Sequence, residues 1–287
     1  MSVAQLAGGR IPSVVRRAAV RDPLVIAAGI VLLGVAVMAV FGPLLAPYPP
    51  DALFVGPVSG PPTLQHPMGT DDLGRDILSR VLVGTRPSVV GPVIVVIAAS
   101  LLGATLGIVS AWFGGIVDGI SARAIEVIFA IPGLVLAVLA VAMFGKGLIA
   151  PVIALSIAYI PIIARLVRAS AFQELGKPYI AALRIQGVSS SAICFRHLVP
   201  ALLPAIFAQA TVGFGYAMLD LAAISFLGLG AQPPASDWGV MIAGGQPALL
   251  TGAPEQSMFP ALMVVLTVLA VNVLGARVTT WAEGSEQ

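Results

Sequence analysis

Long apolar runs without a charged side chain alternate with short polar segments along the chain. A helix needs about 20 apolar residues to cross a bilayer, whereas the strands of an outer-membrane barrel alternate in character over about ten residues. The charge-free runs cover residues 23–50, 87–117, 127–145, 147–164, 197–219 and 256–276. This pattern predicts an all-α polytopic membrane protein with six transmembrane helices. We expect these helices near residues 24–45, 88–112, 125–144, 148–167, 204–229 and 259–280.

Basic residues are unevenly distributed over the segments that join these helices. With the N-terminus inside, eleven Lys and Arg residues fall on the inner side and four on the outer side. Basic residues favour the cytoplasmic side of membrane proteins. Both termini are therefore expected in the cytoplasm.

Composition supports the membrane class, since 58% of the residues are hydrophobic and 10% are charged. A soluble domain carries about 25% charged residues. Arg16, Arg17 and Arg21 shortly precede the first apolar run, as basic residues would in a secretory signal, but the run is much longer than the apolar core of such a signal, which has about 7–15 residues. We therefore expect a retained helix. The single cysteine, Cys194, excludes an intramolecular disulfide.

The predicted helices divide the chain into segments. These are a cytoplasmic tail (1–23), a first transmembrane helix (24–45), an external loop with an amphipathic helix (46–87), a five-helix core (88–280) and a cytoplasmic tail (281–287). Within the core we expect a cytoplasmic loop at 169–203 and an external loop at 230–258.

The external loop 46–87 is expected to carry a helix that lies on the outer surface. Thr70 or Asp71 can cap it. Apolar residues recur at helical spacing on one face, namely Leu73, Ile77 and Val81. Opposite charges lie at i,i+3 and i,i+4 spacing, in the pairs Asp72–Arg75 and Asp76–Arg80. Capping and pairing account for these acidic residues better than a cation site, because the sequence lacks the pattern of a calcium loop.

The external loop 230–258 is too long for a plain turn. It contains Pro233, Pro234 and Trp238, followed by an apolar run. These residues suggest an ordered hairpin that dips toward the membrane surface.

Residues for conventional catalysis are scarce. His66 is expected outside and His197 inside, and the chain has no zinc-protease, nucleophile-elbow or phosphate-loop motif. We expect no enzymatic activity, metal site or cofactor in this chain. Asp220 lies within the fifth apolar run, where an ionisable group is by default a functional hypothesis. We favour two roles for Asp220 over a part in a proton relay, which normally needs several such groups. Asp220 would either accept a hydrogen bond from a donor inside the bundle or line a water-filled cavity.

A polar segment at residues 179–204 separates the fourth and fifth apolar runs. It predicts a short helix over 178–186, a bend at Gly187, where glycine permits unusual backbone angles, and a second short helix capped by Ser189. Pro200 and Pro204 are expected to end this second helix and return the chain to the membrane.

The second short helix is expected to have an apolar side and a basic end. Ile193, Phe195 and Leu198 form the apolar side, while Arg196 and His197 suit the negative end of the helix dipole. Such a helix could dock in a groove of a soluble partner or rest on lipid headgroups. Spacing alone does not separate these two interpretations.

Three motifs, in order along nearly the whole chain, resemble the permease subunits of binding-protein-dependent ABC importers. The matching inner residues are Tyr179, Ala182, Arg184, Gly187, Ser189, Ile193, Arg196, His197 and Pro200. An outer motif is similar to the dipeptide, oligopeptide and nickel class, with Gly69, Thr70, Asp71, Gly74, Arg75, Asp76 and Arg80. The stretch from Asp220 to Trp238, with its Pro-Pro pair, resembles the C-type subunit of that class, most closely the dipeptide permease.

This resemblance implies the type I importer permease fold in a prokaryotic plasma membrane. It also implies a sister permease subunit, two ATPase subunits that bind ATP and Mg, and an extracytoplasmic solute-binding protein. The inner segment would contact the ATPases. Dipeptides or short oligopeptides would be the substrates, with nickel or another small solute as the alternative in the same class. A proton-coupled carrier that uses Asp220 is the alternative from another class.

The inner motif departs from the family pattern at three positions. Ala181 stands where the family usually has glutamate, so an ion pair made by that glutamate in relatives is not expected here. Leu183 and Ile185 replace smaller residues. Because Gly187 and the Arg-His end are retained, docking of the segment is expected to persist.

Overall fold

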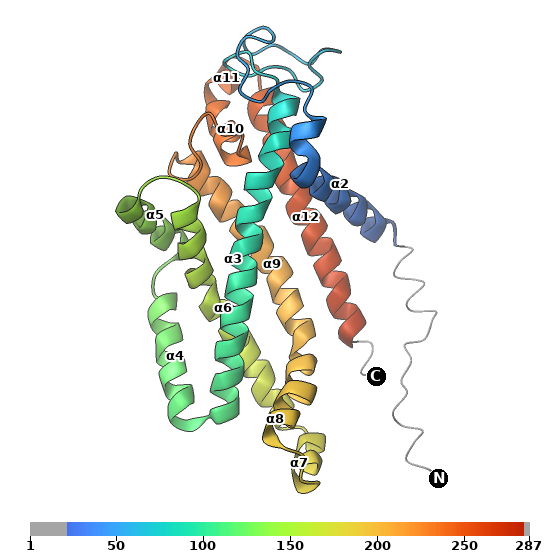
Figure 1. Ribbon diagram of the computed structural model, residues 1–287, viewed down its shortest axis with the longest axis vertical. Helices are drawn as coiled ribbons and strands as arrows, with labels where there is room; N and C mark the ends of the chain where they lie inside the picture. The colour runs from blue at the N-terminus through green and yellow to red at the C-terminus, as the bar shows by residue number, and fades with distance from the viewer. Residues whose placement is uncertain (1–21, 284–287) are drawn as a thin grey trace.

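In a computed structural model the chain forms a bundle of long helices that run between an outer and an inner end (Figure 1). The structure describes residues 22–283, with side chains described to residue 277. The expected tails at 1–23 and 281–287 lie almost entirely outside these residues. Within residues 22–283 the structure contains helices and an isolated β-bridge between Thr70 and Asp76, but no strand. The helices are α2 Pro23–Leu45, α3 Ile77–Phe113, α4 Gly115–Phe129, α5 Gly133–Phe144, α6 Ile149–Leu175, α7 Pro178–Ile185, α8 Ser190–Ile193, the π-helix η2 Cys194–Leu198, α9 Val199–Phe226, α10 Trp238–Gly244, α11 Gln246–Leu250 and α12 Glu255–Glu283.

Five stretches of helix in the described chain are long and apolar enough to cross a membrane, and α4 with α5 makes a sixth if the pair counts as one span. The sequence predicts one membrane-crossing helix near residues 125–144. The structure instead has two helices that meet at 74°. Pro132 is the N-cap of α5, and a proline in the middle of a helix would remove a backbone hydrogen bond and clash with the preceding turn. The residues of the third predicted span are therefore divided between two helices.

The start of α3 also differs from the expectation. The predicted surface helix, capped by Thr70 or Asp71, is absent from the described chain. Asp76 is the N-cap of α3, and its Oδ2 accepts a hydrogen bond from the backbone N–H of Ser79 at 2.8 Å. From Ile77 the helix continues through 37 residues, about 55 Å at 1.5 Å per residue, so the outer turns and the second span form a single element.

Side chains of the outer motif form a turn instead of a helix. Asp71 Oδ1 accepts hydrogen bonds from the backbone N–H groups of Leu73 and Arg75, both at 2.9 Å. This local bonding competes with helix formation, as aspartate side chains commonly do. Leu73, expected on the apolar face, is exposed.

The core of the bundle is built around α3, which packs most extensively against α6 (Figure 1). Two glycines of α3 make this close approach possible. A Cβ atom at Gly103 would lie 2.9 Å from the carbonyl oxygen of Ile160, and one at Gly107 would lie 2.7 Å from that of Ala164. Small residues at helix contacts are typical of membrane proteins, because they let backbones come close together.

Three groups of buried apolar side chains follow the bundle from its outer to its inner end. The outer group includes Ile77 and Trp238, the middle group Val95 and Leu155, and the inner group Leu198. The inner group thus joins the polar segment after α6 to the helices that cross the membrane.

Candidate functional site: the inner segment between α6 and α9

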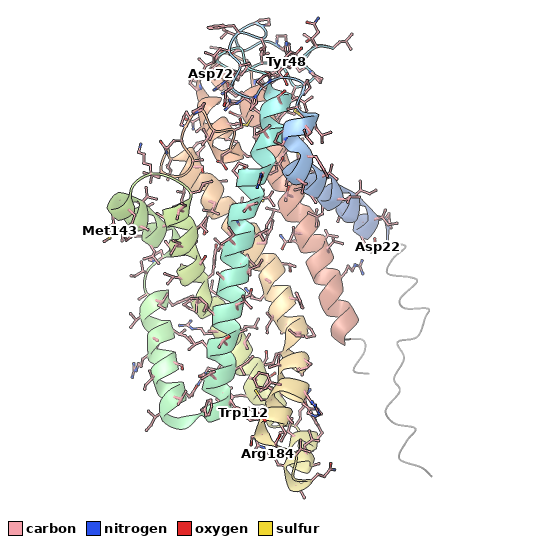
Figure 2. The ribbon with its side chains drawn as sticks, in the orientation of Figure 1. Asp22, Tyr48, Asp72, Trp112, Met143 and Arg184 are labelled. Atoms are coloured by element: carbon pink, nitrogen blue, oxygen red, sulfur yellow. The ribbon has the colours of Figure 1, made fainter. Side chains whose placement is uncertain are left out.

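The segment formed by α7, α8 and η2 lies at the inner end of the bundle, opposite the external loops (Figure 1). In Figure 2, Arg184 is at this inner end, while Tyr48 and Asp72 lie at the outer end. We call residues 178–200 the inner segment.

Contacts with the end of α6 fix the first short helix. Ile180 of α7 is fully buried. The hydroxyl of Tyr179 donates a 2.6 Å hydrogen bond to Glu174 Oε1, and Lys177 Nζ lies 2.8 Å from Glu174 Oε2. Pro178 occupies the first turn, where proline loses no helical hydrogen bond. The orientation of α7 is thus set by a buried apolar anchor and by a carboxylate of the preceding helix.

Gly187 forms the bend between the two short helices, as the sequence predicts. Its φ angle is +76°, a region that glycine enters at no steric cost. No heavy atom of the described residues lies within 4 Å of the place where a Cβ would stand. Glycine is therefore favoured here by the positive φ angle, and not because a larger side chain would clash with its neighbours. After the bend, Ser189 caps α8 by accepting a 3.3 Å hydrogen bond from the N–H of Ala192.

The prediction that Pro200 and Pro204 end the second short helix is wrong. The chain continues from α8 through the π-helix Cys194–Leu198 directly into α9. Pro200 lies in the first turn of α9 and Pro204 inside it. A π turn widens the helix, and we attribute its position here to Pro200, whose ring would otherwise clash with the preceding turn and which has no N–H to donate. The helical part of the inner segment is consequently continuous with α9.

The apolar residues of the second short helix are divided between two sides. Ile193 and Leu198 are buried and pack within this chain. Phe195 is 73% exposed, and on the other side of the bend Ile185 is 87% exposed. The expected apolar side made of Ile193, Phe195 and Leu198 is thus not one surface, and the exposed apolar surface combines a residue of each short helix.

Basic side chains accompany this exposed surface. Arg184 and Arg196 are exposed, and His197 is half-buried, with its ring 6.3 Å from that of Tyr179. Of the sequence-predicted residues of this segment, Ile193 is buried, His197 is half-buried and the others are exposed. The exposed ones are Tyr179, Ala182, Arg184, Gly187, Ser189, Phe195, Arg196 and Pro200.

The outer motif is brought together, but with pairs that differ partly from those expected. Asp72 does lie 3.5 Å from Arg75, whose Nε donates to Asp71 Oδ2 at 2.6 Å. Arg80 does not pair with Asp76 but lies 3.5 Å from Asp71 Oδ2. The reason is that Asp76 caps α3 and also contacts His66 Nδ1 at 2.9 Å.

The remaining residues of the outer motif shape the turn. Gly69 and Gly74 have φ angles of +77° and +70°, and a Cβ at either would meet a backbone carbonyl oxygen within 2.7 Å. The hydroxyl of Thr70 donates to the carbonyl of Pro57. Among the described residues, no group of three or more His, Cys, Asp and Glu side chains is placed to hold a metal ion.

The second external loop is attached to α3 by Arg80 of the outer motif and by its own Trp238. Arg80 Nη2 donates to the carbonyl oxygens of Pro234 and Ala235 at 3.3 and 3.4 Å. The Nε1 of the fully buried Trp238 donates to the carbonyl of Val81 at 3.2 Å. Pro233 precedes a cis peptide bond to Pro234. The two external loops therefore form one structure over the outer end of α3, in which the helices α10 and α11 follow the Pro-Pro pair.

Burial influences one carboxyl group of this outer structure. Asp237 caps α10 and accepts a 3.2 Å hydrogen bond from the N–H of Val240. Its removal from solvent raises the pKa of Asp237, while hydrogen bonds from Ser88 and from the backbone of α10 oppose the shift. The arrangement is that of a structural cap.

Asp220 has a partner that spacing did not reveal. The hydroxyl of Tyr159, on α6, donates to Asp220 Oδ2 at 2.7 Å. Glu174 is a second residue that the sequence analysis missed, although its i,i+3 spacing to Lys177 was a usable signal. Tyr159 gave no such signal, because it contacts a residue 61 positions away.

Comparisons with known proteins agree with this arrangement. Residues 103–284 match the family described as binding-protein-dependent transport system inner membrane component, and residues 13–67 match the N-terminal transmembrane domain of oligopeptide transport permease C. The glutathione transport system permease protein GsiD of Pectobacterium atrosepticum is 37% identical over 256 residues, which cover 89% of this chain and 85% of that protein.

Two further relatives show the same extent of similarity. The GsiD protein of Escherichia coli O1:K1 is 38% identical over 89% of this chain and 84% of its own. The dipeptide transport system permease protein DppC of Alkalihalophilus pseudofirmus is 35% identical over 260 residues, with the same two coverages. The motifs, the helical bundle and these matches lead to one conclusion: the chain belongs to the family of binding-protein-dependent transport system inner membrane components, as a multi-pass C-type permease of an ABC importer.

Proposed function

We propose that this chain is one of two membrane subunits of an ATP-driven importer of dipeptides or other short peptides, glutathione included. Relatives named for glutathione and for dipeptide transport, each matching 89% of the chain, support a peptide substrate. In this proposal a sister permease forms the other half of the pathway, and an extracytoplasmic binding protein delivers the peptide to the external loops. Two cytoplasmic ATPase subunits bind ATP and Mg, and this chain has no catalytic role.

The observation that carries the proposal is the exposed surface of the inner segment. Ile185 and Phe195 are large apolar side chains on the cytoplasmic side, flanked by Arg184 and Arg196. Apolar anchors with a polar rim are typical of residues that enter a groove of a partner protein. Contact with an ATPase subunit would cover them.

The connections of the inner segment suit the transmission of force. Ile180, Ile193 and Leu198 are buried, so each part of the segment is anchored in the bundle. The segment joins α6 through Glu174 and continues without interruption into α9. A displacement of this surface would therefore move two membrane-crossing helices together.

ATP can change the conformation of such a bundle only if the ATPases contact its two states differently. The inner segment is the place that we assign to these contacts. The family assignment favours this mechanism over the alternative of a self-sufficient proton-coupled carrier that uses Asp220.

Variants of the exposed surface test the proposal in the complete complex reconstituted in liposomes. Ile185→Asp and Phe195→Asp each place a charge where we expect an apolar anchor, and each should lower ATPase co-purification and peptide uptake about tenfold or more. Leu250→Asp is a matched control, because Leu250 is 91% exposed but lies at the outer end. It should leave ATPase binding unchanged.

Two results would contradict the proposal. One is normal ATPase binding and uptake in both inner variants. The other is accumulation of peptide against a gradient by this chain and its sister permease without any ATPase, driven by a proton gradient and abolished by Asp220→Asn.

A further inference from the structure

Asp220 has one carboxylate oxygen bound and the other accessible. Tyr159 donates to Oδ2 at 2.7 Å. No described residue donates a hydrogen bond to Oδ1, and among the described side chains the buried polar atom without a partner is Ser100 Oγ, not an oxygen of Asp220. Oδ1 therefore reaches the surface of the chain.

Among the described residues, no cation forms an ion pair with Asp220. The ion pairs among the described side chains involve other carboxylates. A charged group within a membrane span is energetically unfavourable and normally pairs with another group or faces a water-filled pathway. The complement of this carboxylate is therefore expected outside the described part of this chain.

The position of Asp220 is close to the side from which a substrate enters. It lies six residues before Phe226, the last residue of α9, which corresponds to about 9 Å at 1.5 Å per residue. Tyr216 lies one turn deeper on the same face, since residues four apart share a face of a helix, and it is 61% exposed.

An accessible carboxylate beside an exposed aromatic ring has the chemistry of an ammonium-binding site. A carboxylate forms strong, charge-assisted hydrogen bonds with ammonium groups, and the face of a tyrosine ring attracts cations. We propose that Asp220 and Tyr216 bind the positively charged amino group of the transported peptide in the pathway. This inference rests on the proposed function, and it assigns the side of the pathway on which the peptide's amino end is held.

Tyr159 is a positioning residue in this site. Its ring packs against the middle and inner groups of buried apolar side chains, so the hydroxyl is held by the bundle. By binding Oδ2, it directs Oδ1 toward the surface. Tyr159→Phe keeps the packing of the ring and removes only this hydrogen bond.

The same chemistry has a second possible source, because a Lys or Arg of the sister permease is also a cation. The experiment must therefore distinguish a cation on the peptide from one on the neighbouring subunit. The test compares uptake of a dipeptide that has a free amino group with uptake of the same dipeptide after N-acetylation, in the complete reconstituted complex. The quantity measured is the ratio of kcat/KM for the two peptides. The binding protein also discriminates between them, but it is the same in every variant and its contribution cancels when ratios are compared.

The proposal predicts a specific pattern of ratios. Asp220→Asn should lower the preference for the free amine about fivefold to tenfold, as expected for the loss of one charge-assisted hydrogen bond. Tyr216→Leu should lower it in the same direction, whereas Tyr216→Phe, which keeps the ring, should not. Tyr159→Phe should raise the KM of the free-amine peptide with little change in kcat.

An unchanged ratio in Asp220→Asn and Tyr216→Leu would overturn the inference. Equal loss of uptake for both peptides, or loss of the sister permease on purification of Asp220→Asn, would place the cation on the neighbouring subunit and overturn it as well. Failure of the proposed function can be told apart from failure of this inference, because uptake by the unaltered complex would then not require ATP.

Discussion

The hydroxyl of Tyr179 is held 2.6 Å from Glu174 Oε1, across the junction between the last turn of α6 and the first turn of α7. Lys177 binds the other oxygen of the same carboxylate at 2.8 Å. The carboxylate that fixes the start of the inner segment belongs to α6, so a membrane-crossing helix holds the segment directly.

Glu174 should accordingly determine how efficiently ATP hydrolysis is coupled to uptake. Glu174→Ala removes both contacts and should raise the number of ATP molecules hydrolysed per peptide imported about threefold or more, because each contact is a charge-assisted hydrogen bond. Glu174→Gln retains an acceptor for Tyr179 and should give an intermediate value. The measurement is simultaneous ATPase and uptake assay in liposomes. Coupling equal to that of the unaltered chain in Glu174→Ala would show that the contact is dispensable.

The backbone at Gly187 provides a second test. Gly187→Ala should destabilise the inner segment by about 1 kcal/mol, because an L-residue at a φ angle of +76° is strained. A matched control is Gly176→Ala, at the end of α6, where φ is −79° and an added Cβ would make only ordinary contacts. Hydrogen exchange of residues 178–193 should increase in the first variant and not in the second. Equal exchange in both would contradict the strain argument.

Arg80 should be a major determinant of stability at the outer end. Its buried guanidinium binds Asp71 and carbonyl oxygens of the second external loop. Arg80→Ala leaves these acceptors without their donor and should lower the free energy of unfolding by about 3 kcal/mol. Arg123→Ala removes an arginine whose side chain is 85% exposed and pairs with Glu126 at 3.3 Å, so it should change stability by less than about 1 kcal/mol. Thermal unfolding of purified protein measures both, and similar melting temperatures would refute the assignment.

The sequence predicted the membrane-crossing elements because their signal is local. Charge-free length identified α2, α6, α9 and α12, and the special backbone needs of glycine located the bend at Gly187. The positions of helix breaks were less predictable, since proline has no single effect. Pro132 stands at the break before α5, whereas Pro204 lies within a helix, where bundle neighbours can satisfy the freed backbone groups.

The parts of the site that spacing did not reveal depend on tertiary contacts. Tyr159 and Asp220 lie on different helices, and only packing of α6 against α9 brings them together. The two sides of the inner segment differ in burial for the same reason. Ile193 and Phe195 are equally apolar in sequence, but the bundle covers one and leaves the other exposed.

The contact between α3 and α6 offers the last test, because it fixes the bundle that the inner segment would move. A Cβ at Gly107 would lie 2.7 Å from the carbonyl oxygen of Ala164 and 2.9 Å from the N atom of Arg168. These are backbone atoms, so the helices themselves must separate. Gly107→Ala should therefore lower the free energy of unfolding by about 2 kcal/mol. Gly119→Ala in α4, where no described heavy atom lies within 4 Å of the new Cβ, should be neutral or stabilise by about 0.5 kcal/mol. The difference in melting temperature between these two variants measures the close packing directly, and its absence would mean that α3 and α6 do not approach as closely in the membrane.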